Sequence, residues 1–178
     1  RTQPLHIYAH ADLEKLLRPM LDYHCQDLPY ELLFHPINPR KREVIWEDRT
    51  VTVESIPLKH KVPTCGFLFI EKHRGQEPRK RYAYCSDTAY REQIVEQIHG
   101  VDVLYHEATY TERDVDKCKK HTHSTAKQAA NIARLAQAGK LVIGHFSARE
   151  DDHNIFLDEA QQVFPNTVLA IERTTIDL

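Results

Sequence analysis

Apolar segments of strand length alternate with helical segments along the second half of the chain, and this alternation restricts the possible folds more than any other feature. The segments are, in order, Tyr82–Cys85, Glu92–Ile98, Val101–Tyr105, Thr125–Ala138, Leu141–Gly144, Ile155–Val163 and Val168–Ile171. An amphipathic helix between two strands buries its apolar face against a sheet. The alternation therefore predicts a layered α/β fold.

The first half of the chain contains similar elements. Leu5–Tyr8 has the pattern of a short strand, and Asp12 is placed to cap a helix that Pro19 should kink or restart. Further strands are predicted over Glu31–Ile37, Thr50–Ile56 and Gly66–Ile70.

The clearest helix is the alanine-rich segment Thr125–Ala138. Thr125 and Gln128 have the spacing of a capping box, which predicts the start of this helix. Gly139 stands where a C-terminal capping glycine is expected.

Composition excludes several classes of protein. The chain has 178 residues, the size of one domain, and its net charge of −2 excludes a surface that is basic throughout, though not a local basic patch. No apolar run approaches the roughly 20 residues of a membrane span, so we expect no membrane partner. The cysteines are widely spaced and form no C-x-x-C pair, which predicts reduced thiols and a cytoplasmic location.

A potential metal ligand follows each of four predicted strands. These residues are His60, Asp87, His106 with Glu107, and His145. Ligands of layered α/β proteins gather beyond the carboxyl ends of strands, so we expect these side chains to converge. Imidazole and carboxylate ligands without thiolate favour Zn²⁺ over Mn²⁺ or Fe²⁺. The alternative is that these histidines are structural, as single histidines at strand ends commonly are.

Six motifs in order resemble those of ribonuclease Z, the transfer-RNA 3′-processing endonuclease family of the metallo-β-lactamase superfamily. They are Pro4–Tyr8, Leu58–Phe67, Tyr84–Thr88, His106–Thr109, His123–Ala126 and His145–Arg149. The His-Glu-Ala-Thr segment followed by His-Ser-Thr is specific to this family within the superfamily. The resemblance implies a four-layer αββα fold, of which this chain would be the C-terminal part of a single domain.

The resemblance also implies a role for individual residues. His60 and His145 would each bind one of two zinc ions, and Asp87 would bridge both, because a carboxylate offers two oxygens. Glu107 would orient His123, which would donate a proton to the leaving 3′ oxygen.

Two residues that follow the last of these ligands could contact the substrate. Ser147 and Arg149 come directly after His145 and could bind RNA phosphate. For Arg149 an ordinary surface salt bridge is the alternative.

The sequence departs from the family pattern in three places, the smallest of which is Glu150, where the family has tyrosine. The His-x-His-x-Asp-His signature that supplies the remaining ligands is absent, and the chain begins with Arg1. The segment between His60 and Asp87 is short, which predicts the loss of a substrate-binding arm between about residues 73 and 79. We therefore expect a piece of a longer enzyme, inactive as 178 residues alone. The alternative is a truncated relative.

These observations predict a zinc-dependent endonuclease that removes the 3′ trailer from precursor transfer RNA, with two zinc ions per complete subunit. The family resemblance also implies a homodimer. Two alternatives remain open from the sequence: another hydrolase of the same fold, such as a phosphodiesterase or thioesterase, and an inactive truncated partner subunit.

Overall fold

The structure, a computed structural model, describes residues 1–72 and 79–177. The chain divides into two compact units, Arg1–Pro39 and Arg40–Leu178. The segment in which the sequence predicts a lost arm lies outside the described residues. In the described part of the chain, no helix is both long and apolar enough to cross a membrane.

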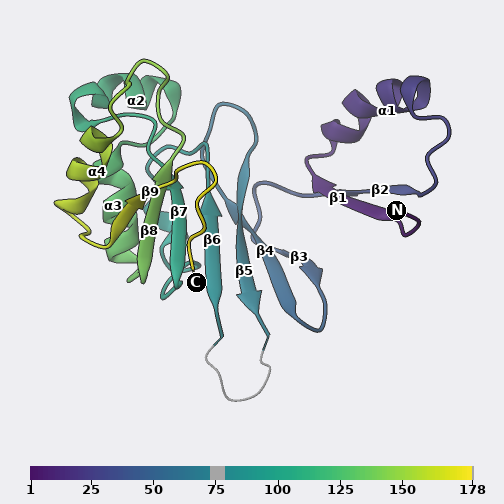
Figure 1. Ribbon diagram of the computed structural model, residues 1–178, viewed down its shortest axis with the longest axis horizontal. Coiled ribbons are helices and arrows are strands. Elements are labelled where there is room, and N and C mark those ends of the chain that lie inside the picture. Colours follow the sequence, from purple (N-terminus) through teal and green to yellow (C-terminus); the bar gives the residue numbers. More distant parts are fainter. Residues whose placement is uncertain (73–78, 178) are drawn as a thin grey trace. The chain divides into compact units, whose positions relative to one another are not determined.

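The first unit is a β-α-β element (Figure 1). Strand β1 (Leu5–Ala9) pairs in parallel with β2 (Leu32–Pro36), and helix α1 (Asp12–His24) connects them. The helix continues through Pro19, so the predicted restart is wrong. The carbonyl that Pro19 leaves without a donor belongs to the exposed Lys15, where water can bond to it. Asp12 lies inside the helix and does not cap it, because Ala11 holds the N-cap position.

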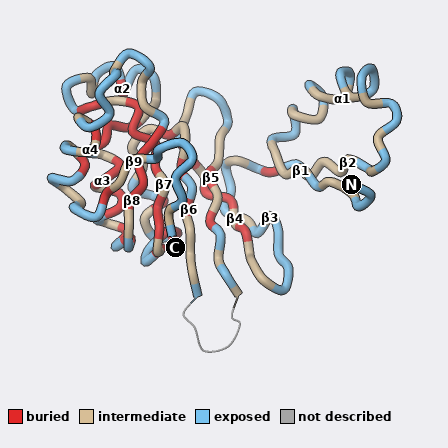
Figure 2. Tube along the Cα trace, viewed as in Figure 1, coloured by how far each residue is buried: buried red, intermediate tan, exposed pale blue. Residues whose placement is uncertain are grey.

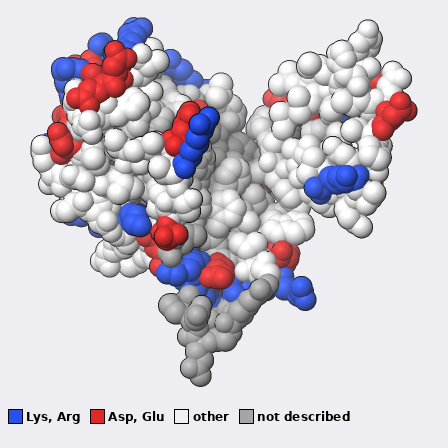
Figure 3. Space-filling model, in the orientation of Figure 1, with Lys and Arg blue, Asp and Glu red and all other residues white. Residues whose placement is uncertain are grey.

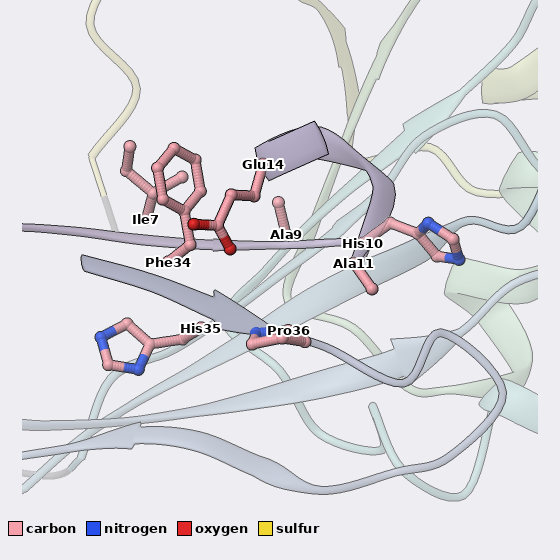
Figure 4. Close-up of a pocket in the computed structure, with 8 residues that line it drawn as sticks. All are labelled: Ile7, Ala9, His10, Ala11, Glu14, Phe34, His35 and Pro36. Atoms are coloured by element: carbon pink, nitrogen blue, oxygen red, sulfur yellow. The ribbon is translucent and has the colours of Figure 1, made fainter. Parts of the chain in front are cut away.

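A narrow crevice lies between α1 and the ends of β1 and β2 (Figure 4). Its volume of about 10 Å³ is room for about one water molecule. The lining residues are Ile7, Ala9, His10, Ala11, Glu14, Phe34, His35 and Pro36. A space this small cannot hold a substrate.

The second unit is built on a sheet that has seven strands within residues 40–72 and 79–177 (Figure 1). The strands lie in chain order: β3 (Val44–Glu47), β4 (Val51–Pro57), β5 (Cys65–Glu71), β6 (Arg81–Cys85), β7 (Val103–Glu107), β8 (Lys140–Gly144) and β9 (Thr167–Leu169). Strands β3 to β6 are antiparallel, whereas β6 to β9 are parallel. The parallel half is the half in which helical segments connect the strands, as the sequence predicts.

Helices pack on the parallel half of this sheet. They are α2 (Val115–His121), α3 (Ala126–Leu135) and α4 (Asn154–Gln161), with short 3₁₀ turns η1 (Glu92–Ile94) and η2 (Glu112–Asp114). Helices α3 and α4 contact each other, α3 lies against β7 and β8, and α4 lies against β9. Leu104, Leu141 and Ile143 of the sheet pack in one core with Ile132 of α3 and Phe156 of α4, and all five are almost completely buried. Figure 2 shows buried stretches of the chain along β7, β8 and α3. The predicted mixed α/β class is therefore confirmed.

Helix α3 begins as predicted but ends early. The Thr125 and Gln128 side chains form both hydrogen bonds of the capping box. At the other end, Gln137 adopts the left-handed conformation with φ of 52°, and Ala138 N–H bonds the Ala133 carbonyl at 3.0 Å. This is a Schellman motif with glutamine at the position that glycine usually holds. Gly139 serves another purpose, because a Cβ there would lie 2.7 Å from the Asp102 carbonyl oxygen.

The predicted helix over Glu92–Ile98 is also wrong in length. The structure has the 3₁₀ turn η1 followed by turns that reach Gly100. Ile94 and Ile98 are both buried, and Gly100 has φ of 67°, so the chain reverses direction before a longer helix can form.

Candidate active site

The carboxyl ends of four strands meet at one edge of the sheet. Strands β6, β7 and β8 are parallel neighbours, and β4 has the same direction because two antiparallel pairings separate it from β6. His60 follows β4, Asp87 follows β6, Glu107 ends β7 and His145 follows β8 (Figure 1). The predicted convergence of these four residues at one edge is confirmed.

Glu107 is the buried centre of this edge. Its side chain is fully inaccessible to solvent. One carboxylate oxygen, Oε1, accepts the Thr88 N–H at 2.6 Å and lies 2.8 Å from His123 Nδ1. The other oxygen, Oε2, accepts the Thr109 hydroxyl at 2.6 Å and the Ser124 N–H at 3.1 Å. A buried carboxylate with donors at both oxygens is held in one orientation and stabilised as an anion.

The pKa values of Glu107 and His123 are shifted in opposite directions by their contact. Burial favours the neutral acid, but hydrogen bonds from His123, Thr109 and Ser124 outweigh it and lower the pKa of Glu107. The hydrogen bond to Glu107 raises the pKa of His123 above its ordinary value, against the opposing effect of burial. The result is a carboxylate–imidazole pair whose histidine retains a proton more readily than a free histidine does.

Asp87 and His145 form a second pair beside the first. His145 Nε2 lies 3.1 Å from Asp87 Oδ1, and the His145 ring centroid is 5.5 Å from that of His123. Both residues have φ of 61°, in the left-handed region that residues other than glycine rarely adopt. Such backbone strain is found mainly where the surrounding structure must aim a side chain. Here it turns both side chains toward the same point.

His60 completes the cluster of imidazoles. Its ring centroid is 4.8 Å from that of His123, and its Nδ1 lies 3.0 Å from the Thr122 carbonyl oxygen. A carbonyl only accepts hydrogen bonds, so Nδ1 of His60 carries the proton in this contact and Nε2 keeps its lone pair. Thr122, with φ of 59°, is a third left-handed residue at this edge.

The donor set fits a metal ion. When His145 is neutral with its proton on Nδ1, its Nε2 and Asp87 Oδ1 are two acceptors that face each other at 3.1 Å, and a cation between them relieves the repulsion. Ligands of a tetrahedral zinc ion with bonds of about 2.0 Å lie about 3.3 Å apart, close to this separation. His60 and His145 each use Nδ1 for a fixed hydrogen bond, as metal-binding histidines almost always use their second nitrogen.

A second possible metal-binding group shares His145 with the first. Glu107, His123 and His145 each offer a ligand atom, and these atoms lie within 4.8 Å of one another. However, both Glu107 oxygens already accept hydrogen bonds from buried donors, and His123 Nδ1 is one of those donors. His145 is therefore the member of this group whose second ring nitrogen, Nε2, faces another carboxylate, that of Asp87, which also accepts the Ser86 hydroxyl at 3.1 Å.

Ser147 and Arg149 lie at the rim of the site. With Thr109 and Tyr110 they line a polar pocket of about 250 Å³, together with Arg113, Lys117 and Glu150. The Ser147 N–H bonds the Thr109 carbonyl at 3.1 Å, which attaches this loop to the catalytic edge. In the described part of the chain, the Arg149 guanidinium has no hydrogen-bond or ion-pair partner, whereas Arg113 pairs with Glu150 at 2.9 Å. The predicted alternative of a surface salt bridge for Arg149 is not observed.

Comparison with known proteins places this arrangement in a family. The beta-lactamase superfamily domain profile matches residues 1–146. Ribonuclease Z of Phocaeicola vulgatus is 41% identical in an alignment of length 221 that covers the whole of this chain and 72% of the relative. Ribonuclease Z of Azobacteroides pseudotrichonymphae is 44% identical over 205 residues, with 71% of its length covered. This chain belongs to the ribonuclease Z family.

Solved structures agree on the fold of this ribonuclease Z chain. It superimposes on the crystal structure of the short form of human tRNase Z with a TM-score of 0.77 and 24% identity, covering 99% of this chain and 69% of the human one. The long form of RNase Z from yeast gives a TM-score of 0.76 at 14% identity, with 97% of this chain and 28% of the yeast chain covered. At these identities the likeness shows the fold alone, and the predicted metallo-β-lactamase fold is confirmed.

Sequence reasoning missed part of this candidate site and included one residue too many. Thr88 and Ser124 hold Glu107 through backbone N–H groups, which no side-chain pattern reveals. Thr109 stood inside a recognised motif, but its role depends on a contact with His145, 36 residues away. His106 points the other way, because alternate residues of a strand face opposite sides. It is completely buried, and its Nδ1 bonds the Glu107 carbonyl oxygen at 2.8 Å.

Proposed function

We propose that this chain belongs to a zinc-dependent endoribonuclease that removes the 3′ trailer from precursor transfer RNA. The observation that supports this most directly is the Glu107–His123 pair next to the Asp87–His145 pair. Relatives named ribonuclease Z and a structural neighbour named tRNase Z indicate the substrate class. In this proposal His60, Asp87 and His145 hold part of a two-zinc centre. Zinc bound there would stabilise the charge on the attacking and leaving oxygens of a phosphodiester.

His123 supplies the proton in this proposal. Its Nδ1 is held by Glu107, so the Nε2–H of the imidazolium is the group that can reach a substrate. Hydrolysis breaks the bond between phosphorus and the 3′ oxygen, and that oxygen takes the proton from Nε2. Glu107 stabilises the imidazolium before the transfer and fixes the direction of the ring, which keeps a general acid available near neutral pH.

Ser147 and Arg149 are proposed to bind a phosphate of the RNA. A phosphate in their pocket would find the Arg149 guanidinium, which forms no direct ion pair with a described carboxylate. Two of the three lysines of α2 are less available, because Lys117 pairs with Asp114 at 2.6 Å and Lys119 lies 4.0 Å from Asp116. Figure 3 shows basic and acidic side chains interspersed where α2 lies, so Arg149 is the better candidate for a phosphate contact.

The same proposal includes the assembly and the location of the protein. A homodimer is expected from the family resemblance, and a cytoplasmic location from the widely spaced cysteines. Both suit an enzyme that acts on newly transcribed RNA.

The test incubates the protein that carries this chain with a 3′-extended precursor transfer RNA and Zn²⁺. We expect one cut at the 3′ end of the mature sequence, and a loss of about 100-fold or more in kcat for His123→Ala. His99→Ala is the matched control, because His99 is exposed and lies outside the site. Intact precursor together with rapid hydrolysis of a small ester would contradict the proposal, as would a His123→Ala rate within a few-fold of wild type.

A further inference from the structure

Thr109 has a hydroxyl group at the junction of the two pairs in the site. The residue is 7% exposed and comes two positions after Glu107, the last residue of β7. Its Oγ1 is 2.6 Å from Glu107 Oε2 and 2.8 Å from His145 Nδ1. The hydroxyl therefore connects the carboxylate of one pair to the imidazole of the other.

The proton positions along this chain of contacts follow from the chemistry of each atom. Glu107 accepts the backbone N–H groups of Thr88 and Ser124, one at each oxygen, and these donors stabilise it as the carboxylate, which has no proton to donate. Two oxygens 2.6 Å apart require a proton between them, and the hydroxyl of Thr109 is its only source. Oγ1 then has only lone pairs left for His145, so Nδ1 of His145 must bring the proton of that second contact.

This arrangement decides which nitrogen of His145 is left for a ligand. With the proton held at Nδ1, the lone pair of a neutral His145 is on Nε2, the atom that faces Asp87 at 3.1 Å. The opposite tautomer would donate from Nε2 to Asp87 and would present no lone pair to a metal. Without a partner at Nδ1, the aspartate would favour that unproductive tautomer.

We infer that Thr109 is a positioning residue. Its hydroxyl, held by Glu107, fixes the ring orientation and the tautomer of His145. One buried carboxylate then orients the proton donor His123 through Oε1 and the metal ligand His145 through Oε2 and the Thr109 hydroxyl. The inference rests on the proposed function, because that function assigns a metal to His145. Nothing in the sequence motif separates this role of the threonine from simple packing.

The test determines the tautomer of His145 by NMR of ¹⁵N-histidine-labelled protein without metal. The spectra are recorded at about pH 8.5, where an ordinary imidazole is neutral. The His145 signals are assigned by their loss in His145→Gln. We expect Nδ1–H in wild type and in Thr109→Ser, which keeps the hydroxyl. We expect Nε2–H in Thr109→Val, which keeps the shape of the side chain and removes the hydroxyl.

Zinc titration against a chromophoric chelator gives a second readout. We expect affinity to fall about 10- to 100-fold in Thr109→Val and to recover in Thr109→Ser. The control is Thr111→Val, since Thr111 is equally buried on the same loop and its hydroxyl makes no hydrogen bond within the described chain.

Three outcomes would overturn the inference: Nε2–H in the wild type, Nδ1–H retained in Thr109→Val, or equal zinc affinities in wild type and Thr109→Val. The wild-type spectrum decides the matter even if Thr109→Val does not fold. None of these measurements uses RNA. A protein that shows the expected tautomers but leaves precursor transfer RNA intact would refute the proposed function and leave the inference standing.

Discussion

Replacing Glu107 by glutamine should destabilise the folded protein as well as impair the site. The amide keeps one oxygen and puts an NH₂ group where the other oxygen was. If the NH₂ takes the position of Oε2, the buried Ser124 N–H loses its acceptor, and if it takes the position of Oε1, the Thr88 N–H does. Thr109 and His123 can move a proton in response, but a backbone N–H cannot.

The magnitude follows from these contacts. A buried donor without an acceptor costs about 1–3 kcal/mol, and each hydrogen bond that loses a charged partner weakens further. We therefore expect Glu107→Gln to lower the free energy of unfolding by about 2–5 kcal/mol. For a chain of this length that corresponds to a fall in Tm of roughly 5–15 °C.

The assay is urea unfolding followed by circular dichroism, in a buffer with a metal chelator so that lost zinc binding does not contribute. Glu96→Gln provides the matched control. Glu96 is exposed and makes no hydrogen bond in the described chain, so its replacement should change stability by less than about 0.5 kcal/mol. A Glu107→Gln protein as stable as the control would refute the reasoning, because Glu107 could not then be the ionised acceptor of buried donors.

Three further predictions concern other parts of the second unit. Gln137→Gly should raise the free energy of unfolding by about 1 kcal/mol, because glycine adopts the left-handed conformation at the end of α3 without strain. Gly139→Ala should lower the free energy of unfolding, because its Cβ would clash with the Asp102 carbonyl oxygen. Urea unfolding of both variants checks that the two changes have opposite signs. Asp48 accepts the N–H groups of Thr50 and Val51, bonds that lower its pKa from 3.8 to about 2. The stability advantage of wild type over Asp48→Ala should thus be present above about pH 4 and shrink as pH falls toward 2, and a pH-independent difference would contradict it. Arg149→Ala should leave Tm unchanged and raise KM for precursor transfer RNA about tenfold, while Lys127→Ala, an exposed control on α3, should change neither.

The sequence predicts most of the elements because their signals are local. The capping box at Thr125 and Gln128 and the strand that ends at Gly144 are decided by neighbours within a few residues. The errors arise where a contact between distant segments decides the local structure. Gly139 looks like a helix cap until the backbone of Asp102, 37 residues earlier, is seen to leave no room for a Cβ. A close approach between distant segments has no local signature.

For the candidate site too, the sequence identifies the residues, whereas their contacts depend on the tertiary structure. The motifs alone identify His60, Asp87, Glu107, His123 and His145 as a group, since each follows a strand or precedes a helix whose position the sequence predicts. The tertiary structure alone decides how the group works. It buries Glu107 completely, turns Asp87 and His145 into left-handed conformations, and brings the Thr109 hydroxyl between the two pairs. Hydrogen bonds act over about 3 Å, so the roles of these atoms are settled only when packing brings distant segments to that distance.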